Sequence, residues 1–194
     1  MKKKTITTRK IVFTALMAAL TVVGSWLRIT TPAAVGTTSF HLGNIMCALA
    51  GLLLGPVYGA LAAGLGSAIF DLLHPLYASE CWITFLTKGT YGLVVGLIAW
   101  SGKKYWSANM GKAYLRGLIA TVAGALTYAI LYLSKGCFYD GMLMGGLSFE
   151  AALIPVVTGK AAATTFNAVV AIIAAPLLGM GISKGLKAAR LSLE

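Results

Sequence analysis

Charged residues are scarce in this chain of 194 residues. They make up 11% of it, and only five are acidic, whereas roughly a quarter of an ordinary soluble domain is charged. Hydrophobic residues make up 58%, and the mean hydropathy is +0.84. This composition excludes an ordinary soluble domain and indicates an integral, multi-pass membrane protein of helical type.

The chain also lacks the sequence features of several enzyme classes. It contains no glycine-rich loop that ends in Gly-Lys-Ser/Thr, which would hold a nucleotide phosphate. Its three cysteines, Cys47, Cys81 and Cys137, lack the spacing of metal ligands and are expected to be packed side chains. No Ser-His-Asp or paired-carboxylate pattern stands out. We therefore expect no enzyme activity, no metal and no cofactor on this chain.

Basic residues outnumber acidic ones, and the net charge of +11 would suit a nucleic-acid partner. However, the basic residues lie in short segments between apolar runs, which is typical of the cytoplasmic loops of membrane proteins. We expect contact with membrane lipid and none with nucleic acid. The first predicted span, Ile11 to about Ile29, follows five such residues and places the N-terminus inside: Lys2, Lys3, Lys4, Arg9 and Lys10.

The apolar stretch from Leu42 to Leu73 allows either one long helix broken at Gly55-Pro56 or a tight helical hairpin. The hairpin puts seven further basic residues on the same side as the N-terminus, as the positive-inside bias requires: Lys103, Lys104, Lys112, Arg116, Lys184, Lys187 and Arg190. We therefore predict an all-α membrane protein, in which residues 1–194 form a single compact bundle of six transmembrane helices with both termini cytoplasmic.

The remaining predicted elements are three spans and three loops. The spans are Trp82 to Trp100, Tyr114 to about Leu133 and about Ala151 to Leu178; residues 101–113 form an inner loop, and residues 30–40 and 134–149 form outer loops. A helix over residues 43–54 would rise only ~18 Å, against a hydrocarbon core of ~30 Å. Either this helix begins earlier or the first outer loop enters the bundle, where irregular backbone implies a cavity.

Polar residues concentrate at the predicted outer ends of the helices. Asp71 and His74 lie together where proline ends a helix, and Lys88 and Lys160 lie within apolar spans. A charge at mid-membrane costs ~2.5–3.5 kcal/mol and usually faces a bundle interior or a cavity. The alternatives are a water-exposed cluster at Asp71 and His74, and a Lys88 side chain that extends outward to the interface. The other acidic residues there are expected to be solvated loop residues: Glu80, Asp140 and Glu150.

Helical spacing brings several of these residues onto common faces. Together the faces predict an aromatic-walled pocket that opens to the outside, the usual form of a small-molecule site. Lys160, deeper in its span, is expected to contribute more to binding than Lys88, and the alternative for Tyr128 and Tyr132 is an interfacial belt. The predicted substrate-binding residues are His41, Asn44, Asp71, His74, Trp82, Phe85, Lys88, Tyr91, Tyr128, Tyr132, Lys160, Thr164 and Asn167.

Four motifs occur in a characteristic order: LGNI at 42–45, LLLGPVYGALAAGLG at 52–66, DLL at 71–73 and TFLTKGTYGLVVGL at 84–97. In this order they resemble the S component, the substrate-binding subunit, of energy-coupling factor (ECF) vitamin transporters. The resemblance is closest to the group that includes members for riboflavin, hydroxymethylpyrimidine and pyridoxine. It covers nearly the whole chain and is most specific between Leu42 and Leu97.

The resemblance implies a multi-pass subunit of the bacterial cell membrane that captures a vitamin or precursor outside the cell. It would then associate with a transmembrane coupling subunit and two cytoplasmic ATPase subunits, so that ATP is used by the partners. Ala15 and Ala19 match the family's Ala-x-x-x-Ala motif, which docks on the coupling subunit.

The substrate follows less directly from the sequence. A small pocket with lysine, histidine, asparagine and tyrosine suits a hydroxylated pyridine or pyrimidine ring. We expect vitamin B6 forms such as pyridoxine, with hydroxymethylpyrimidine, riboflavin and pantothenate as alternatives. A self-sufficient secondary transporter would usually show two repeated halves, and a membrane-embedded enzyme would need a catalytic constellation.

Overall fold

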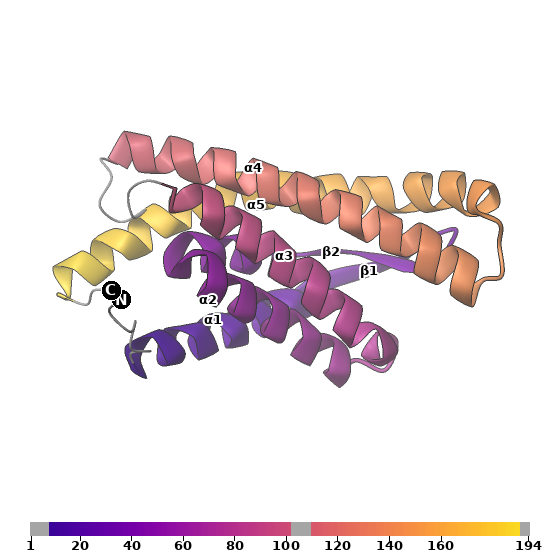
Figure 1. Cartoon of the computed structure of the whole chain (residues 1–194), viewed down its shortest axis with the longest axis horizontal. Helices are drawn as coiled ribbons and strands as arrows, with labels where there is room; N and C mark the ends of the chain where they lie inside the picture. The colour runs from indigo at the N-terminus through magenta and orange to yellow at the C-terminus, as the bar shows by residue number, and fades with distance from the viewer. Residues whose placement is uncertain (1–7, 102–109, 191–194) are drawn as a thin grey trace, which may run out of the picture.

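The computed structural model describes residues 8–101 and 110–190 and is predominantly helical (Figure 1). Five of its helices are long and apolar enough to cross a membrane. The predicted basic residues Lys2, Lys3, Lys4, Lys103 and Lys104 lie outside the described residues. In chain order the elements are α1 (Thr8–Trp26), β1 (Arg28–Pro32), β2 (Thr37–His41), α2 (Gly43–Leu73), the 3-10 turn η1 (Ala78–Glu80), α3 (Cys81–Ala99), α4 (Met110–Lys135), the π-helix η3 (Gly136–Met144) and α5 (Phe149–Ala188).

The long helix α2 is interrupted at Gly55, whose φ of 79° and ψ of −172° are not helical. Pro56 follows and has no backbone N–H to continue the helical hydrogen bonds. Cys47 Sγ and Ser67 Oγ lie 3.7 Å apart although 20 residues separate them; in a straight helix the separation would be about 30 Å. Residues 43–54 and 56–73 therefore fold back on each other as a helical hairpin.

Glycines allow α3 to pack against both halves of this hairpin. A Cβ at Gly59 would lie 2.6 Å from the Gly51 Cα, and a Cβ at Gly92 would lie 2.6 Å from the Gly59 oxygen. Such close backbone approach is how helices associate inside a bilayer, where apolar burial gives little driving force. At the turn, the Trp100 indole donates a hydrogen bond to the Leu52 oxygen at 2.9 Å. The core of the bundle is thus built on α2 and α3.

The segment predicted as an outer loop at 30–40 is instead an antiparallel β-hairpin within an otherwise helical protein. Arg28 pairs with His41 at its base and Pro32 with Thr37 near its tip, where Gly36 adopts a φ of 71°. The hairpin enters the bundle beside α5 (Figure 1), and α2 begins only at Gly43. The two strands pair with each other, and the Asn167 side chain bonds the backbone of Ser39 and His41, as non-helical backbone inside a bundle requires.

The predicted outer loop at 134–149 is also largely helical. The helix α4 continues to Lys135, and η3 prolongs it to Met144 before Ser148 begins α5 by accepting a hydrogen bond from the Ala151 N–H. In Figure 1 the β-hairpin tip, η1 and η3 lie at one end of the bundle, and the start of α1 and the end of α5 lie at the other.

Candidate functional site

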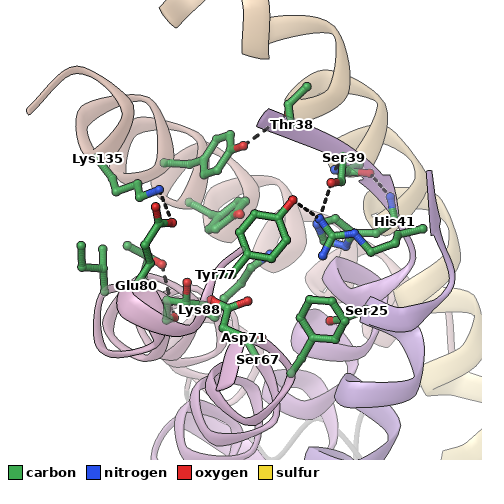
Figure 2. A pocket seen from close by; sticks show the side chains of 18 of the residues that line it. Ser25, Thr38, Ser39, His41, Ser67, Asp71, Tyr77, Glu80, Lys88 and Lys135 are labelled. Carbon is green, nitrogen blue, oxygen red and sulfur yellow. Dashed lines mark hydrogen bonds and ion pairs between the residues drawn. The ribbon is translucent and has the colours of Figure 1, made fainter. Parts of the chain in front are cut away.

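A cavity of about 110 Å³ lies between the β-hairpin and the helices α2 to α5. Figure 2 shows Thr38, Ser39 and His41 on the hairpin, Asp71 and Ser67 on α2, Lys88 on α3, and Lys135 beside Glu80. Seven of the predicted substrate-binding residues line it: His41, Asp71, Lys88, Tyr128, Tyr132, Thr164 and Asn167. The structure therefore brings together side chains from five elements that the sequence analysis could place only on separate faces.

The other residues of the lining were not among the predicted substrate-binding residues. They come from the end of α1, the β-hairpin, α2, the segment from Tyr77 through η1, the first turns of α3 and the end of α4: Ser25, Arg28, Thr37, Thr38, Ser39, Ser67, Phe70, Tyr77, Glu80, Ile83, Thr84, Thr87 and Lys135. Most are serine and threonine, which are common in any membrane helix and carry no signal of their own. Arg28 did carry a sequence signal. The positive-inside bias predicts few arginines at the outer end of a first span, so an arginine there is unusual.

Lys88 points into the bundle rather than outward. Its side chain is buried at 6% exposure, its Nζ donates a hydrogen bond to Asn44 Oδ1, and the Nζ lies 3.9 Å from the centroid of the Tyr128 ring. The alternative that Lys88 extends to the interface is therefore wrong. Asn44 is 2% exposed and lies outside the cavity lining, so it positions Lys88 from behind.

Three tyrosines form an aromatic stack along one side of the cavity. The ring centroids of Tyr91 and Tyr128, and those of Tyr128 and Tyr132, are 5.7 Å apart, with interplanar angles of 27° and 22°. Tyr128 is 8% exposed, so it is not an interfacial belt residue. Tyr91 is fully buried behind the lining. Tyr132 reaches the β-hairpin, where its hydroxyl lies 3.3 Å from Thr38 Oγ1.

Arg28 enters the cavity from β1. Its Nη2 donates hydrogen bonds to Ser39 Oγ and, at 2.9 Å, to the Tyr77 hydroxyl. The guanidinium carbon lies 5.0 Å from the centroid of the Phe70 ring and 4.7 Å from that of Tyr77. Cation–π contacts of this kind are stabilising when the cation is removed from water. The arginine is thus held in place between two rings.

An ion-pair network lies at the cavity rim and corrects two predictions. Lys160 Nζ is 2.6 Å from Asp140 Oδ2, and Lys135 Nζ is 2.8 Å from Asp140 Oδ1 and 2.5 Å from Glu80 Oε2. Glu80 and Asp140 are therefore not simply solvated loop residues; Glu150 is exposed as expected. Lys160 is 1% exposed and outside the lining, and the ion pair with Asp140 balances its charge. The structure thus places Lys88, and not Lys160, in the cavity lining.

Three other predicted residues lie outside the lining. His74 lies against two aromatic rings, with its ring centroid 5.8 Å from that of Phe70 and 4.9 Å from that of Tyr77. Trp82 is 58% exposed. Phe85 packs α3 against α2, because a Cβ at Gly64 would lie 3.0 Å from its ring. The structure thus separates Asp71, which lines the cavity, from His74, which does not.

His41 faces the cavity as a neutral ring. Its Nδ1 accepts a hydrogen bond from the Gly43 N–H at 3.1 Å, which leaves the proton on Nε2. Burial, and then the charges of Lys88 and Arg28, lower the pKa of His41 well below its usual value. Within residues 8–101 and 110–190, no group of three or more His, Cys, Asp or Glu side chains is placed to hold a metal ion.

Comparison with known proteins gives concordant matches. Residues 5–184 match the family described as ECF-type riboflavin transporter, S component. An uncharacterized protein in a gap 3′ region of Pyrococcus woesei is 30% identical over 169 residues, 87% of this chain and 95% of the relative. A UPF0397 protein of Streptococcus gordonii is 34% identical over 132 residues, 66% of this chain and 67% of the relative. The chain therefore belongs to the ECF-type riboflavin transporter S component family of membrane proteins.

Proposed function

We propose that this protein captures a small vitamin or vitamin precursor from outside the cell and presents it to an ECF transporter for ATP-driven uptake. Family membership supports the role of a vitamin-transporter substrate-binding subunit. The observation that carries the proposal is the cavity itself. Its lining combines the buried side chain of Lys88 and the side chain of Arg28 from β1 with aromatic rings and hydroxyl groups. Apolar walls with a few converging polar groups are the usual form of a small-molecule site.

In this proposal the chain crosses the membrane six times, with both termini cytoplasmic. The fold-back at Gly55 supports the count, because it divides α2 into two segments that run in opposite directions. The charges support the orientation: Asp71, Glu80, Asp140 and Glu150 lie toward the cavity end, and the opposite ends of the helices carry basic residues such as Lys112.

Cysteine labelling tests this topology. In a background without the three native cysteines, Ser148→Cys should react with a membrane-impermeant maleimide added to intact cells. Ser101→Cys should react only after the membrane is opened. Both positions are exposed, so a lack of reaction would not be caused by burial. Labelling of Ser101→Cys in intact cells would contradict the six-span topology.

The cavity size favours a single-ring substrate. Its volume of about 110 Å³ is below the ~300–1,000 Å³ of sites for drug-sized ligands. Tyr128 and Tyr132 offer ring faces, while Thr164 and His41 offer hydrogen-bonding groups. We therefore propose vitamin B6 forms such as pyridoxine as substrate. Hydroxymethylpyrimidine has a ring of the same size and is the nearest alternative; riboflavin and pantothenate are further ones.

Docking on the partners is proposed to involve α1. Ala15 and Ala19 are exposed and one helical turn apart, and small residues at this spacing let a second helix approach closely. The partner would be the transmembrane coupling subunit, which would in turn carry two cytoplasmic ATPase subunits.

Co-purification and uptake test the proposal together. The tagged protein, extracted from its native membranes, should bring down a coupling subunit and two ATPases. Mass spectrometry of small molecules released on denaturation should identify a vitamin or precursor. Vesicles containing the chain together with the partners should accumulate this compound only with ATP. Accumulation by vesicles that contain the chain alone would favour a self-sufficient secondary transporter.

A further inference from the structure

The four cations around the cavity fall into two classes. Lys135, in the lining, and Lys160, outside it, contact carboxylates at 2.5 to 2.8 Å. Arg28 and Lys88, in the lining, form no ion pair with any carboxylate among residues 8–101 and 110–190. The two cations without a carboxylate partner indicate which chemical group the ligand carries. This inference rests on the proposed function of the cavity as the substrate site.

Lys88 has only neutral partners. Its Nζ donates to the Asn44 amide oxygen and faces the Tyr128 ring, which leaves ammonium protons without a charged acceptor. The side chain is 6% exposed, so bulk water solvates it little. A buried charge without a counter-charge is costly, and such groups are normally paired. Asp71 lines the same cavity, but it lies beyond ion-pair distance of Lys88.

Arg28 has donor capacity that the protein does not use. Its Nη2 bonds two hydroxyl groups, those of Ser39 and Tyr77, but its Nε is buried without any hydrogen-bond partner. Unpartnered buried donors are rare and unfavourable. The rings of Phe70 and Tyr77 fix the guanidinium in place, so the arginine is already ordered before any ligand binds.

The charges in the lining leave an excess of one positive charge. Arg28, Lys88 and Lys135 face two carboxylates, Asp71 and Glu80, and Lys135 is engaged by Glu80. Including the rim pair of Asp140 and Lys160 leaves the balance unchanged. A ligand with one negative charge would therefore neutralise the cavity, whereas a neutral ligand would leave the positive charge buried beneath it.

We propose that the substrate carries a carboxylate, which Arg28 and Lys88 bind, so that a ring acid of similar size takes the place of the neutral pyridoxine proposed above. Guanidinium groups match the geometry of a carboxylate, and hydrogen bonds between charged partners are stronger than neutral ones. The ring or chain that bears the carboxylate lies against Tyr128 and Tyr132. Among candidates of similar size, this site selects the acid over the corresponding amide or alcohol.

Calorimetric titration of the purified, ligand-free protein at pH 7.5 tests this with three acid and neutral pairs. The pairs are pyridine-3-carboxylate with pyridine-3-carboxamide, 4-pyridoxate with pyridoxine, and pantothenate with panthenol. In each pair that binds, the acid should bind roughly ten- to a hundredfold more tightly, because a charge-assisted hydrogen bond is lost with the neutral member. Equal or tighter binding of the neutral members overturns the proposal, and so does a failure of all six compounds to bind.

Variants assign the preference to the two cations. Lys88→Met and Arg28→Met should each weaken binding of the acid more than binding of its neutral partner, so that the acid's advantage becomes smaller. Lys112→Met, an exposed lysine on the opposite end of α4, is the matched control and should keep the full preference. If a variant fails to fold, the comparison of acid and neutral ligands on the wild-type protein still tests the proposal. If the acid preference is absent but co-purification and ATP-driven uptake succeed, only this inference fails and the proposed function stands.

Discussion

Asn167 on α5 donates a hydrogen bond from its side-chain amide to the backbone oxygen of Ser39 on β2, over 2.8 Å and across 128 residues of sequence. The oxygen of the same amide accepts the N–H of His41 at 2.9 Å. One side chain therefore serves two backbone groups of the β-hairpin that borders the cavity. The sequence pattern predicted Asn167 as a ligand-binding residue; the structure shows that much of its hydrogen-bonding capacity is used to hold the hairpin.

Asn167→Ala should loosen the hairpin. The change leaves the Ser39 oxygen and the His41 N–H without their partner, and lost buried hydrogen bonds are each worth about 1–3 kcal/mol. Hydrogen–deuterium exchange should rise in residues 28–41, and substrate affinity should fall. Thr158→Val, which removes an exposed hydroxyl bonded within the same helix, is the control. Unchanged exchange in the hairpin would show that the strand ladder alone holds it.

The exposed face of α1 gives a second prediction. Ala15→Trp and Ala19→Trp should abolish uptake, because a bulky side chain prevents the close approach of a partner helix. Substrate affinity of the isolated protein should be unchanged, since neither alanine lines the cavity. Radiolabelled uptake and calorimetry measure the two effects. Ala162→Trp, at an exposed alanine on α5, should leave uptake intact; if it is equally harmful, added bulk alone accounts for the loss.

Asp140 links two lysines and should matter for stability. Asp140→Asn removes the counter-charge of Lys160, which is 1% exposed, and breaking one side of a buried ion pair typically costs about 3–5 kcal/mol. Thermal unfolding in detergent should show a large decrease in midpoint. Glu150→Gln, at an exposed carboxylate, should change it little. Similar midpoints for the two variants would mean that solvent or lipid headgroups already screen the network.

His41 should make stability depend on pH. Its pKa in the folded protein lies well below the usual value of about 6.5, so the unfolded chain binds a proton that the folded chain does not. Stability should therefore be unaffected by this group above about pH 6.5 and should fall as the pH decreases below it. Unfolding midpoints between pH 5 and 8 should show a shallower decline for His41→Gln than for wild type. Parallel curves would exclude His41 as the source.

Side chains in the helices were the most predictable part of the site. Regular spacing placed Lys88 and Tyr128 on inward faces, and the structure brings them into contact. The same reasoning placed Lys160 on one helix face with Thr164 and Asn167. However, spacing within one helix cannot show which of these side chains pairs with a residue of a neighbouring element. The π-helix η3 supplies Asp140 to Lys160, and this pairing removes the lysine from the cavity.

Residues outside regular spans were the least predictable. Arg28 and Ser39 enter the cavity because residues 28–41 form a β-hairpin, yet these residues contain the threonine, proline and glycine typical of a loop. Only the short rise of residues 43–54 pointed to polypeptide inside the bundle at this depth. That length argument predicted a cavity, but the strand pairing that builds its wall depends on tertiary contacts with Asn167.

The turn at Gly55 also constrains how the chain can enter the membrane during synthesis. Residues 43–54 form only twelve residues of helix, too few to cross a ~30 Å hydrocarbon core by themselves. Glycines let this segment pack closely against residues 56–73 and against α3, with no room for side chains between the backbones. The two halves of α2 must therefore be inserted as one unit, and a nascent chain that ends between them would lack a stably inserted second segment.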